Sequence, residues 1–265
     1  MFYKFFCFLF YVSLVCAFSC ESLIQHSLHV VKKHCQKYQI DESHNEKHSK
    51  EVVEYSMEMM KNIPDISTDE QQVVILSSIF HDTIDHKYVM DYNRIDILRG
   101  LLKQVLAEKN YKLIPHILDI ILYMSYSKTV SHEDDNSLIF KLPEMMENHP
   151  FLRSYHIVRN ADLLSSYNLK RAIFYTIHKK PWLLEPLQIF DDVYDLYYNR
   201  MFLLRKYNII DCNDNFCKKA SEYLEKQSFL QLEFCKENYF SKNVSSIPYH
   251  DIYKIADMLE VKYNP

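Results

Sequence analysis

Residues 79–87, I-F-H-D-T-I-D-H-K, bring together side chains that could carry out phosphate chemistry. Adjacent His81 and Asp82 can both bind one metal ion, because the imidazole offers a nitrogen and the carboxylate offers oxygen and negative charge. Asp85 follows as a proton-transfer group, and Lys87 as a cation that can bind phosphate. A Lewis acid, a proton acceptor and a cation in one short segment are what cleavage of a phosphate ester needs.

A lone His-Asp pair is common, so a metal site requires further ligands elsewhere in the chain. His48 lies upstream of the pair and Asp162 lies downstream. Two imidazoles and two carboxylates form a donor set for a divalent transition metal or for magnesium. Spacing alone does not pair residues so far apart, and a histidine on an apolar helix face is more often a packed core residue than a ligand.

Helical periodicity and capping patterns predict the elements that must position these residues. A capping box at residues 43–46 predicts a helix that runs to about residue 61 and carries His44 and His48 on its apolar face. A second capping box at residues 67–70 opens an apolar helix that ends at the His-Asp pair. The other expected helices cover residues 21–38, 94–107, 113–124, 151–179, 189–207, 216–238 and 251–259.

The composition favours a helical domain and excludes several kinds of phosphate site. The 265 residues are 48% hydrophobic and 25% charged, which suits one large folded domain or two small ones. A single glycine excludes both glycine-rich phosphate loops and argues against a turn-rich β-sandwich. The net charge of −4 gives no general attraction to nucleic acid. Residues 131–137 are predicted to form a polar loop. Because no long segment alternates apolar and polar residues, the predicted fold class is all-α.

The first nineteen residues are more apolar than the rest of the chain. An uncharged apolar run follows Lys4, and its length fits a signal peptide or a hydrophobic N-terminal helix. A signal peptide implies a secreted or membrane-associated protein, whereas its absence implies a cytoplasmic one; the residues leave both open. The cysteines are scattered and form no C-x-x-C pair, so they predict neither a disulfide framework nor a zinc ribbon.

The order H…HD…D resembles the HD-domain superfamily of metal-dependent phosphohydrolases. It is most similar to small bacterial-type HD hydrolases with the patterns S-H-D-x-x-H-x-x-R-V, H-D-I-x-D-x-K and D-A-D-R-L. The corresponding segments here are S-H-N-E-K-H-S-K-E-V at residues 43–52, the segment at residues 79–87, and N-A-D-L-L at residues 160–164. The similarity covers about residues 43–237, so we expect an HD domain over residues 21–240 and a tail with a short helix over residues 241–265.

The resemblance implies a helical bundle built around one divalent metal ion, which could be Mn, Mg, Co, Ni or Fe. It implies that the enzyme cleaves a phosphoester or phosphoanhydride, in a nucleotide, by a metal-activated water. The implied metal ligands are His48, His81, Asp82 and Asp162.

The resemblance also implies roles for residues outside the ligand set. Asp85 and Lys87 become the catalytic residues, with Asp85 as the proton-transfer group and Lys87 also contacting phosphate. His44 is expected to contact phosphate, and Lys128, beside Ser127, is a further substrate-binding candidate that could equally be a polar helix end.

The sequence departs from the family patterns at three positions near these residues. Asn160 replaces an acid, Leu163 replaces an arginine, and Glu51 stands where the first pattern has arginine. These changes leave open a catalytically impaired HD-fold protein that binds a nucleotide or a partner without turnover. A helical protein whose core simply contains these histidines is the remaining alternative. The sequence leaves a homodimer open and indicates a small phosphate substrate, with no nucleic-acid partner.

Overall fold

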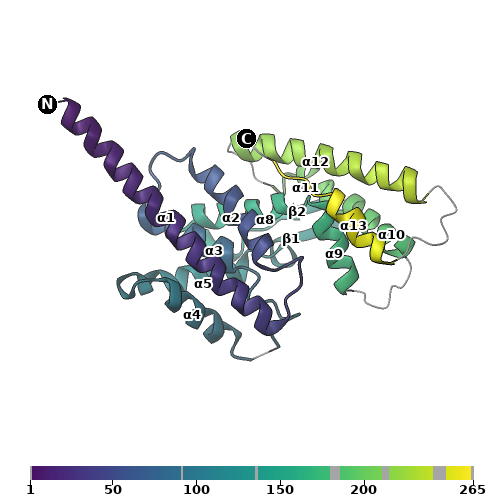
Figure 1. Cartoon of the computed structure of the whole chain (residues 1–265), viewed down its shortest axis with the longest axis horizontal. Helices are drawn as coiled ribbons and strands as arrows, with labels where there is room; N and C mark the ends of the chain where they lie inside the picture. The colour runs from purple at the N-terminus through teal and green to yellow at the C-terminus, as the bar shows by residue number, and fades with distance from the viewer. Residues whose placement is uncertain are drawn as a thin grey trace.

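The computed structural model describes residues 2–90, 92–134, 137–179, 186–210, 215–240 and 249–263. Over these residues the chain is an all-α protein, as the sequence predicted, and its β-structure there is a single two-stranded antiparallel sheet (Figure 1). The first half contains α1 (Phe2–Tyr38), α2 (Glu46–Met60), α3 (Thr68–Phe80), α4 (Arg94–Val105), the 3₁₀ helix η1 (Glu108–Leu113), α5 (Ile114–Tyr123) and α6 (Tyr126–Thr129). The second half contains β1 (Val130–Asp134), β2 (Ser137–Phe140), α7 (Glu144–Glu147), α8 (Leu152–Ser165), α9 (Leu169–Lys179), α10 (Pro186–Leu196), the π-helix η2 (Tyr197–Met201), α11 (Leu203–Lys206), α12 (Asn215–Cys235), the π-helix η3 (Lys236–Phe240) and α13 (Tyr249–Met258).

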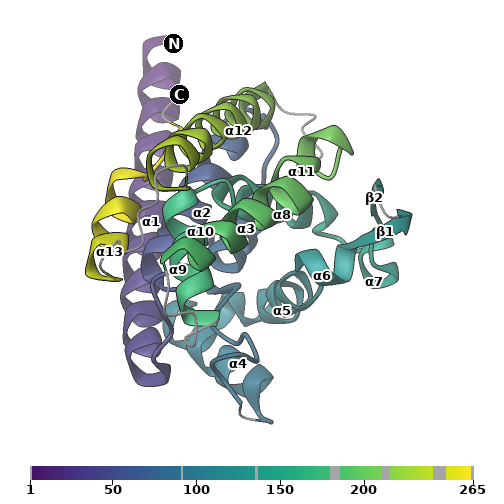
Figure 2. The ribbon, with the colours of Figure 1, turned by 90° about the vertical axis from the view of Figure 1, so that its right-hand side faces the viewer.

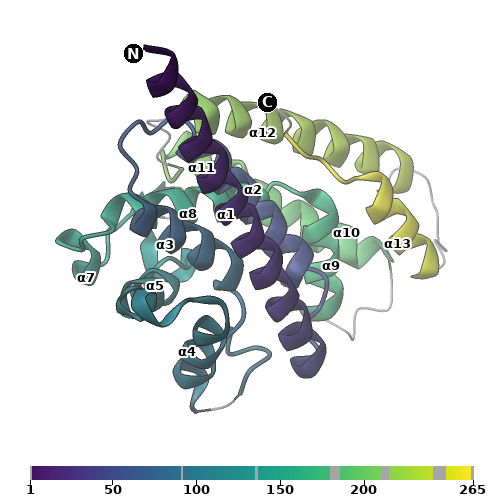
Figure 3. The same cartoon turned by 60° about the vertical axis from the view of Figure 1, so that its left-hand side comes forward.

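Helix α1 is longer than the helix predicted over residues 21–38. It extends without a break from Phe2, so that its N-terminal end projects beyond the other helices (Figures 1 and 3). It ends where Gln39 adopts a positive φ of 54° and the Ile40 N–H donates to the Cys35 carbonyl at 3.0 Å. Among the described residues, no helix is both long and apolar enough to cross a membrane. The signal peptide over residues 1–19 stays a prediction.

One predicted capping box is wrong and the other is confirmed. Helix α2 begins at Glu46, and its N-cap is Asn45, whose side chain accepts a hydrogen bond from the Lys47 backbone. Ser43 lies two residues before this cap, and its hydroxyl donates to Asp41. Helix α3 has the predicted box, in which the side chains and backbones of Ser67 and Glu70 bond reciprocally.

The centre of the molecule is formed by α2, α3 and α8, which pack against one another. Helix α3 is buried along most of its length, with every side chain from Val73 through Phe80 removed from solvent. A helix that is apolar on all sides must have neighbours on all sides, and α1, α2, α5 and α8 surround it (Figure 2). A rigid central helix therefore leads directly into His81.

Several predicted boundaries and one predicted loop need correction. The predicted helix over residues 151–179 is interrupted at residues 166–168, where the Asn168 side chain accepts a hydrogen bond from the Arg171 backbone and opens α9. The predicted helix over residues 189–207 is divided by η2 into α10 and α11. Within residues 131–137, predicted as a polar loop, residues 131–134 belong to β1 and Ser137 begins β2, and the two strands pair Val130 with Phe140. These strands are too short for an alternating pattern to stand out in the sequence.

The C-terminal region matches the predictions in outline. The expected helix over residues 251–259 is α13, while the start of the predicted tail, residues 241–248, lies outside the described residues. Cys217 is disulfide-bonded, which the scattered cysteine spacing did not indicate. Cys20, Cys35 and Cys235 are thiols that form no disulfide.

Candidate metal centre

The three central helices bring the predicted metal ligands together. His48 lies in α2, His81 immediately follows α3 as its C-cap residue, and Asp162 lies near the end of α8. Asp82 follows His81 in a turn where the Thr83 hydroxyl donates to the Phe80 carbonyl at 2.7 Å. The Thr83 backbone N–H donates to the same carbonyl at 3.1 Å, so both bonds stabilise the turn at the end of α3. Packing between α2, α3 and α8 therefore fixes the positions of all four side chains.

The donor atoms of these side chains converge on one point. The Nε2 atoms of His48 and His81 lie 3.0 Å apart. Asp82 Oδ2 lies 3.3 Å from Nε2 of His48 and 3.2 Å from Nε2 of His81. Asp162 Oδ1 lies 3.4 Å and 3.6 Å from the same two nitrogens. His48, His81 and Asp82 thus form a group that can hold one divalent ion, and Asp162 Oδ1 is close enough to both nitrogens to be a fourth ligand.

The other nitrogen of His81 sets the ring in the state that a metal ligand requires. Nδ1 of His81 lies 2.9 Å from the Ser78 carbonyl, which can only accept a hydrogen bond, so Nδ1 carries a proton. A neutral His81 therefore keeps its lone pair on Nε2, which faces His48 and the two carboxylates. An imidazole held by a backbone carbonyl in this way is the usual support for a histidine ligand.

The electrostatics of the four side chains also fit a bound cation. Oδ2 of Asp82 is buried and has no hydrogen-bond partner of acceptable geometry. Burial opposes the charge on Asp82, but the charges of His81 and His44 and the hydrogen bonds from His48 and His81 together outweigh it and hold the pKa of Asp82 well below its usual range. Burial lowers the pKa of His48; at His81 the carboxylates of Asp82 and Asp162 outweigh burial and raise the pKa to about 10. A protonated His81 thus balances the two carboxylates, and a divalent cation can supply the same positive charge.

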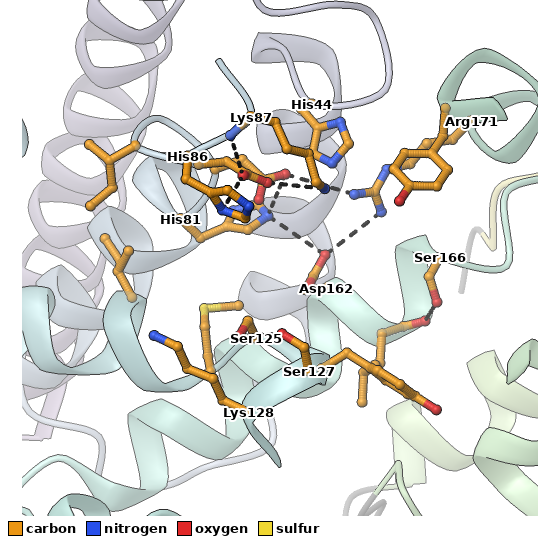
Figure 4. Close-up of a pocket in the computed structure, with 18 of the residues that line it drawn as sticks. His44, His81, His86, Lys87, Ser125, Ser127, Lys128, Asp162, Ser166 and Arg171 are labelled. Atoms are coloured by element: carbon orange, nitrogen blue, oxygen red, sulfur yellow. Dashed lines mark hydrogen bonds and ion pairs between the residues drawn. The ribbon is translucent and has the colours of Figure 1, made fainter. Parts of the chain in front are cut away.

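Arg171 in α9 is a component of the site that sequence reasoning missed. Its guanidinium nitrogens lie 3.8 Å from Asp82 Oδ2 and 3.7 Å from Asp162 Oδ1. Nε of Arg171 donates to the Ser43 carbonyl at 2.7 Å and Nη1 donates to the Ser165 hydroxyl at 3.1 Å. Nothing in the local sequence distinguishes this arginine, because only the turn between α8 and α9 brings it back over Asp162 (Figure 4).

Three of the four converging side chains, His81, Asp82 and Asp162, line a cavity of about 540 Å³, and His48 lies behind them against His81. Asp85 and Lys87 line it, joined by an ion pair of 3.2 Å, as the local motif suggested. The exposed His86 ring lies 3.2 Å from the same Asp85 carboxylate, which also accepts a hydrogen bond from the Lys87 backbone. Asp85, Lys87 and the metal ligands thus share one solvent-connected space, while their roles stay predictions.

His44 also lines the cavity and is held by a network of hydroxyl groups. The hydroxyls of Ser43 and Tyr88 both donate to Asp41, and Nδ1 of His44 lies 2.6 Å from the Ser43 hydroxyl. Because both hydroxyl protons are used on Asp41, Nδ1 of His44 is the donor to Ser43. Burial opposes ionisation of Asp41, but hydrogen bonds from His44, Ser43 and Tyr88 keep its pKa well below the usual range. The network fixes the orientation of the His44 ring.

Lys128 and Ser127 lie on the wall of the cavity that faces these residues, beside Ser125 (Figure 4). The Lys128 ammonium donates to the Leu122 carbonyl and lies 5.7 Å from the centre of the Tyr123 ring. Lys128 is exposed and its charge is directed at the end of α5. The structure therefore places Lys128 at the cavity without turning its charge toward the metal ligands.

A second His-Asp group forms around α5, outside that cavity. Nδ1 of His116 lies 3.2 Å from Nε2 of His149, and Asp119 Oδ2 lies 3.8 Å from the same nitrogen of His149. The backbone N–H of Phe151 donates to Nδ1 of His149 at 3.2 Å. A neutral His149 therefore carries its proton on Nε2 and donates it to His116.

Comparisons of this chain with protein-family models, curated proteins and solved structures find no match.

Proposed function

We propose that this chain is a metal-dependent phosphohydrolase with an HD-type site, which cleaves a phosphoester or phosphoanhydride bond of a nucleotide. The observation that supports it most strongly is the convergence of His48, His81, Asp82 and Asp162, with Asp85 and Lys87 on the same cavity. A divalent ion held by these four side chains would supply Lewis acidity and lower the pKa of a water molecule.

The chain's own residues would then bind and orient the substrate. Lys87 and His44 line the cavity and neutralise phosphoryl oxygens, while Arg171 holds the carboxylates of Asp82 and Asp162 in place. Asp85 accepts a proton from the attacking water or returns it to the leaving oxygen. Its ion pair with Lys87 holds the carboxylate close to the phosphate that Lys87 contacts.

The charge on the cavity wall supports an anionic substrate. Five Lys or Arg side chains line the cavity, against three Asp side chains, before any metal ion is counted. The excess of positive charge falls inside a pocket on a protein whose net charge is −4, so it is a local feature. A substrate with phosphoryl groups matches both this charge and the donor set of the metal centre.

The test is phosphate and pyrophosphate release from a panel of nucleotides with manganese, magnesium, cobalt or nickel. We expect turnover by the parent chain that needs a divalent metal and is lost in Asp82→Ala. Asp119→Ala, which changes the second His-Asp group, is the matched control and should keep full turnover. Metal-dependent phosphate release that survives Asp82→Ala would contradict the proposal. Tight nucleotide binding without turnover under any metal would favour a binding protein instead.

A further inference from the structure

Arg200 has no role in the site described above, although it lines the same cavity. It lies in η2, the π-helical turn between α10 and α11. A π-turn inserts one extra residue into a helix and often occurs at functional sites, because it turns a side chain out of the regular helical position. The Arg200 guanidinium carbon lies 3.6 Å from the centre of the Tyr126 ring, so the ring supports it by stacking.

The Arg200 side chain is half-buried, and its charge is only partly balanced, by the more distant Asp162. Its Nε atom is removed from solvent and has no hydrogen-bond partner. Among the described residues, no Asp or Glu oxygen forms an ion pair with Arg200 within 4.0 Å. Burial lowers the pKa of the Arg200 guanidinium, which shows that the surroundings disfavour its charge. A half-buried cation without a close counter-ion gains from a ligand that supplies negative charge.

Arg171 and Arg200 differ in what they are free to bind. Arg171 is already held by the two metal-site carboxylates, by a backbone carbonyl and by Ser165. Arg200 is left with a stacked aromatic ring and an unpaired Nε. The cavity, at about 540 Å³, lies in the size range of pockets that take a whole small ligand. It therefore has room for an anionic group in addition to the one beside the metal centre.

We infer that Arg200, supported by Tyr126, binds a second phosphoryl group, and that the substrate carries a phosphoanhydride chain, as in a nucleoside diphosphate or triphosphate. The inference deepens the proposed function and rests on it for the position of the first phosphoryl group. The planar guanidinium can donate two parallel hydrogen bonds to phosphate oxygens. The negative charge of the phosphate then offsets the free-energy cost of burying the guanidinium.

The test is a calorimetric titration with tripolyphosphate and with orthophosphate, in EDTA, so that no metal ion contributes. We expect Arg200→Met to weaken tripolyphosphate binding by about tenfold or more, because it removes charge-assisted hydrogen bonds. Orthophosphate binding should change by less than about threefold, since the remaining cations still bind one phosphoryl group. The matched control is Arg205→Met, which removes a guanidinium that already pairs with Glu222 and Glu225 at 3.4 Å and 3.0 Å. It should leave both affinities unchanged.

Thermal melting separates this role from a structural one. Without ligand, Arg200→Met should melt at or above the temperature of the parent chain, because it removes a half-buried charge that has no close counter-ion. The rise in melting temperature that tripolyphosphate gives the parent should disappear in the variant. A variant that melts lower but binds tripolyphosphate like the parent would overturn the inference and assign Arg200 to packing. Tyr126→Leu, which keeps the arginine but removes its support, should weaken binding by a smaller factor.

Nucleotides complete the design and separate the two proposals. Adenosine triphosphate should lose affinity in Arg200→Met as tripolyphosphate does, whereas adenosine monophosphate should not. An effect on tripolyphosphate alone would mean that the site takes free polyphosphate, which overturns the nucleotide part of the inference. Arg200-dependent binding without phosphate release under any metal would defeat the proposed function and leave the second phosphoryl site standing. Phosphate release by the parent, together with an Arg200→Met variant that binds tripolyphosphate as tightly as the parent, would support the proposed function and defeat the second phosphoryl site.

Discussion

The described part of this chain holds two groups of histidine and aspartate that look alike in composition but differ in their hydrogen bonds. In the first, Nδ1 of His81 donates to the Ser78 carbonyl, so a metal ion can take the place of the Nε2 proton without breaking this hydrogen bond. In the second, Nδ1 of His149 accepts from the Phe151 backbone, so Nε2 carries the proton and donates it to His116. A metal ion would have to displace that proton and break the bond to Phe151.

The difference shows that proximity alone does not make a metal site. Both groups bring three potential ligand atoms within 4.8 Å of one another. Only the first has a backbone acceptor that sets the tautomer, a fourth ligand in Asp162 and a cavity beside it. The atoms that support the ligands therefore decide which group can bind a metal ion. The predictions below test this contrast, beginning with the largest effect.

Asp85→Ala should separate catalysis from metal binding within the first group. Asp85 lines the cavity but contributes no atom to the convergence of the four ligands, so the variant should still bind Mn²⁺. Turnover should fall by about 100- to 10,000-fold, the usual contribution of a positioned acid or base. Steady-state kinetics and calorimetry on the same preparation measure both quantities. Loss of Mn²⁺ binding in this variant would make Asp85 a ligand and contradict the assignment.

Glu51→Gln should show how much the burial of the Glu51 carboxylate, beside the first group, lowers the free energy of unfolding. Glu51 lies one turn after His48, and burial raises the pKa of its carboxyl to about 7 from 4.5, against the attraction of Arg171. A raised pKa in the folded state means that stability is full below pH 4.5 and is lost as pH rises to about 7. Above that pH the variant should be more stable than the parent by about 3 kcal/mol or less.

Urea unfolding of parent and Glu51→Gln at pH 4.5 and pH 8 measures this difference. The two proteins should unfold alike at pH 4.5, where the carboxyl is mostly neutral. A variant that is less stable than the parent at pH 8 would mean that the Glu51 charge is compensated in the folded protein.

Mn²⁺ should stabilise the folded chain through the first group and not through the second. At a concentration of one hundred times Kd, a ligand that binds only the folded state adds about 2.7 kcal/mol to the free energy of unfolding. His48→Asn should abolish this increase, whereas His116→Asn should retain it. Urea unfolding with and without Mn²⁺ tests both variants, and an increase that depends on His116 would reverse the comparison.

The smallest expected effect is on the second group itself. The Asp119 carboxylate is 35% exposed and lies 3.8 Å from the His149 ring, so their interaction is weak. Asp119→Asn should change the free energy of unfolding by less than about 1 kcal/mol. Thermal melting in EDTA gives the value, and a loss of several kcal/mol would show that this group is a major structural contact.

The fold class and the central helices were predictable because their signals are local. The capping box at Ser67 and the apolar run through Phe80 specify a buried helix that ends at the His-Asp pair, and the structure contains it. The breaks in the longer predicted helices were not predictable from periodicity. They depend on individual polar contacts, such as the bond between the Asn168 side chain and the Arg171 backbone.

The residues of the candidate site also divide into those with a local sequence signal and those that only the fold brings together. His81, Asp82, Asp85 and Lys87 are close in sequence, so one motif reveals them together. His48 and Asp162 join them only through the packing of α2 and α8 against α3, and the family resemblance was needed to name them. Arg171 and Arg200 carry no local signal, because their importance depends on which charges surround them after folding.

The number of Mn²⁺ ions bound per chain, measured by calorimetry in the parent, Asp82→Ala and Asp119→Ala, tests the central claim most directly. The account predicts that the parent and Asp119→Ala each bind one ion and that Asp82→Ala binds none. Binding that survives Asp82→Ala but is lost in Asp119→Ala would place the metal in the second group and contradict the account.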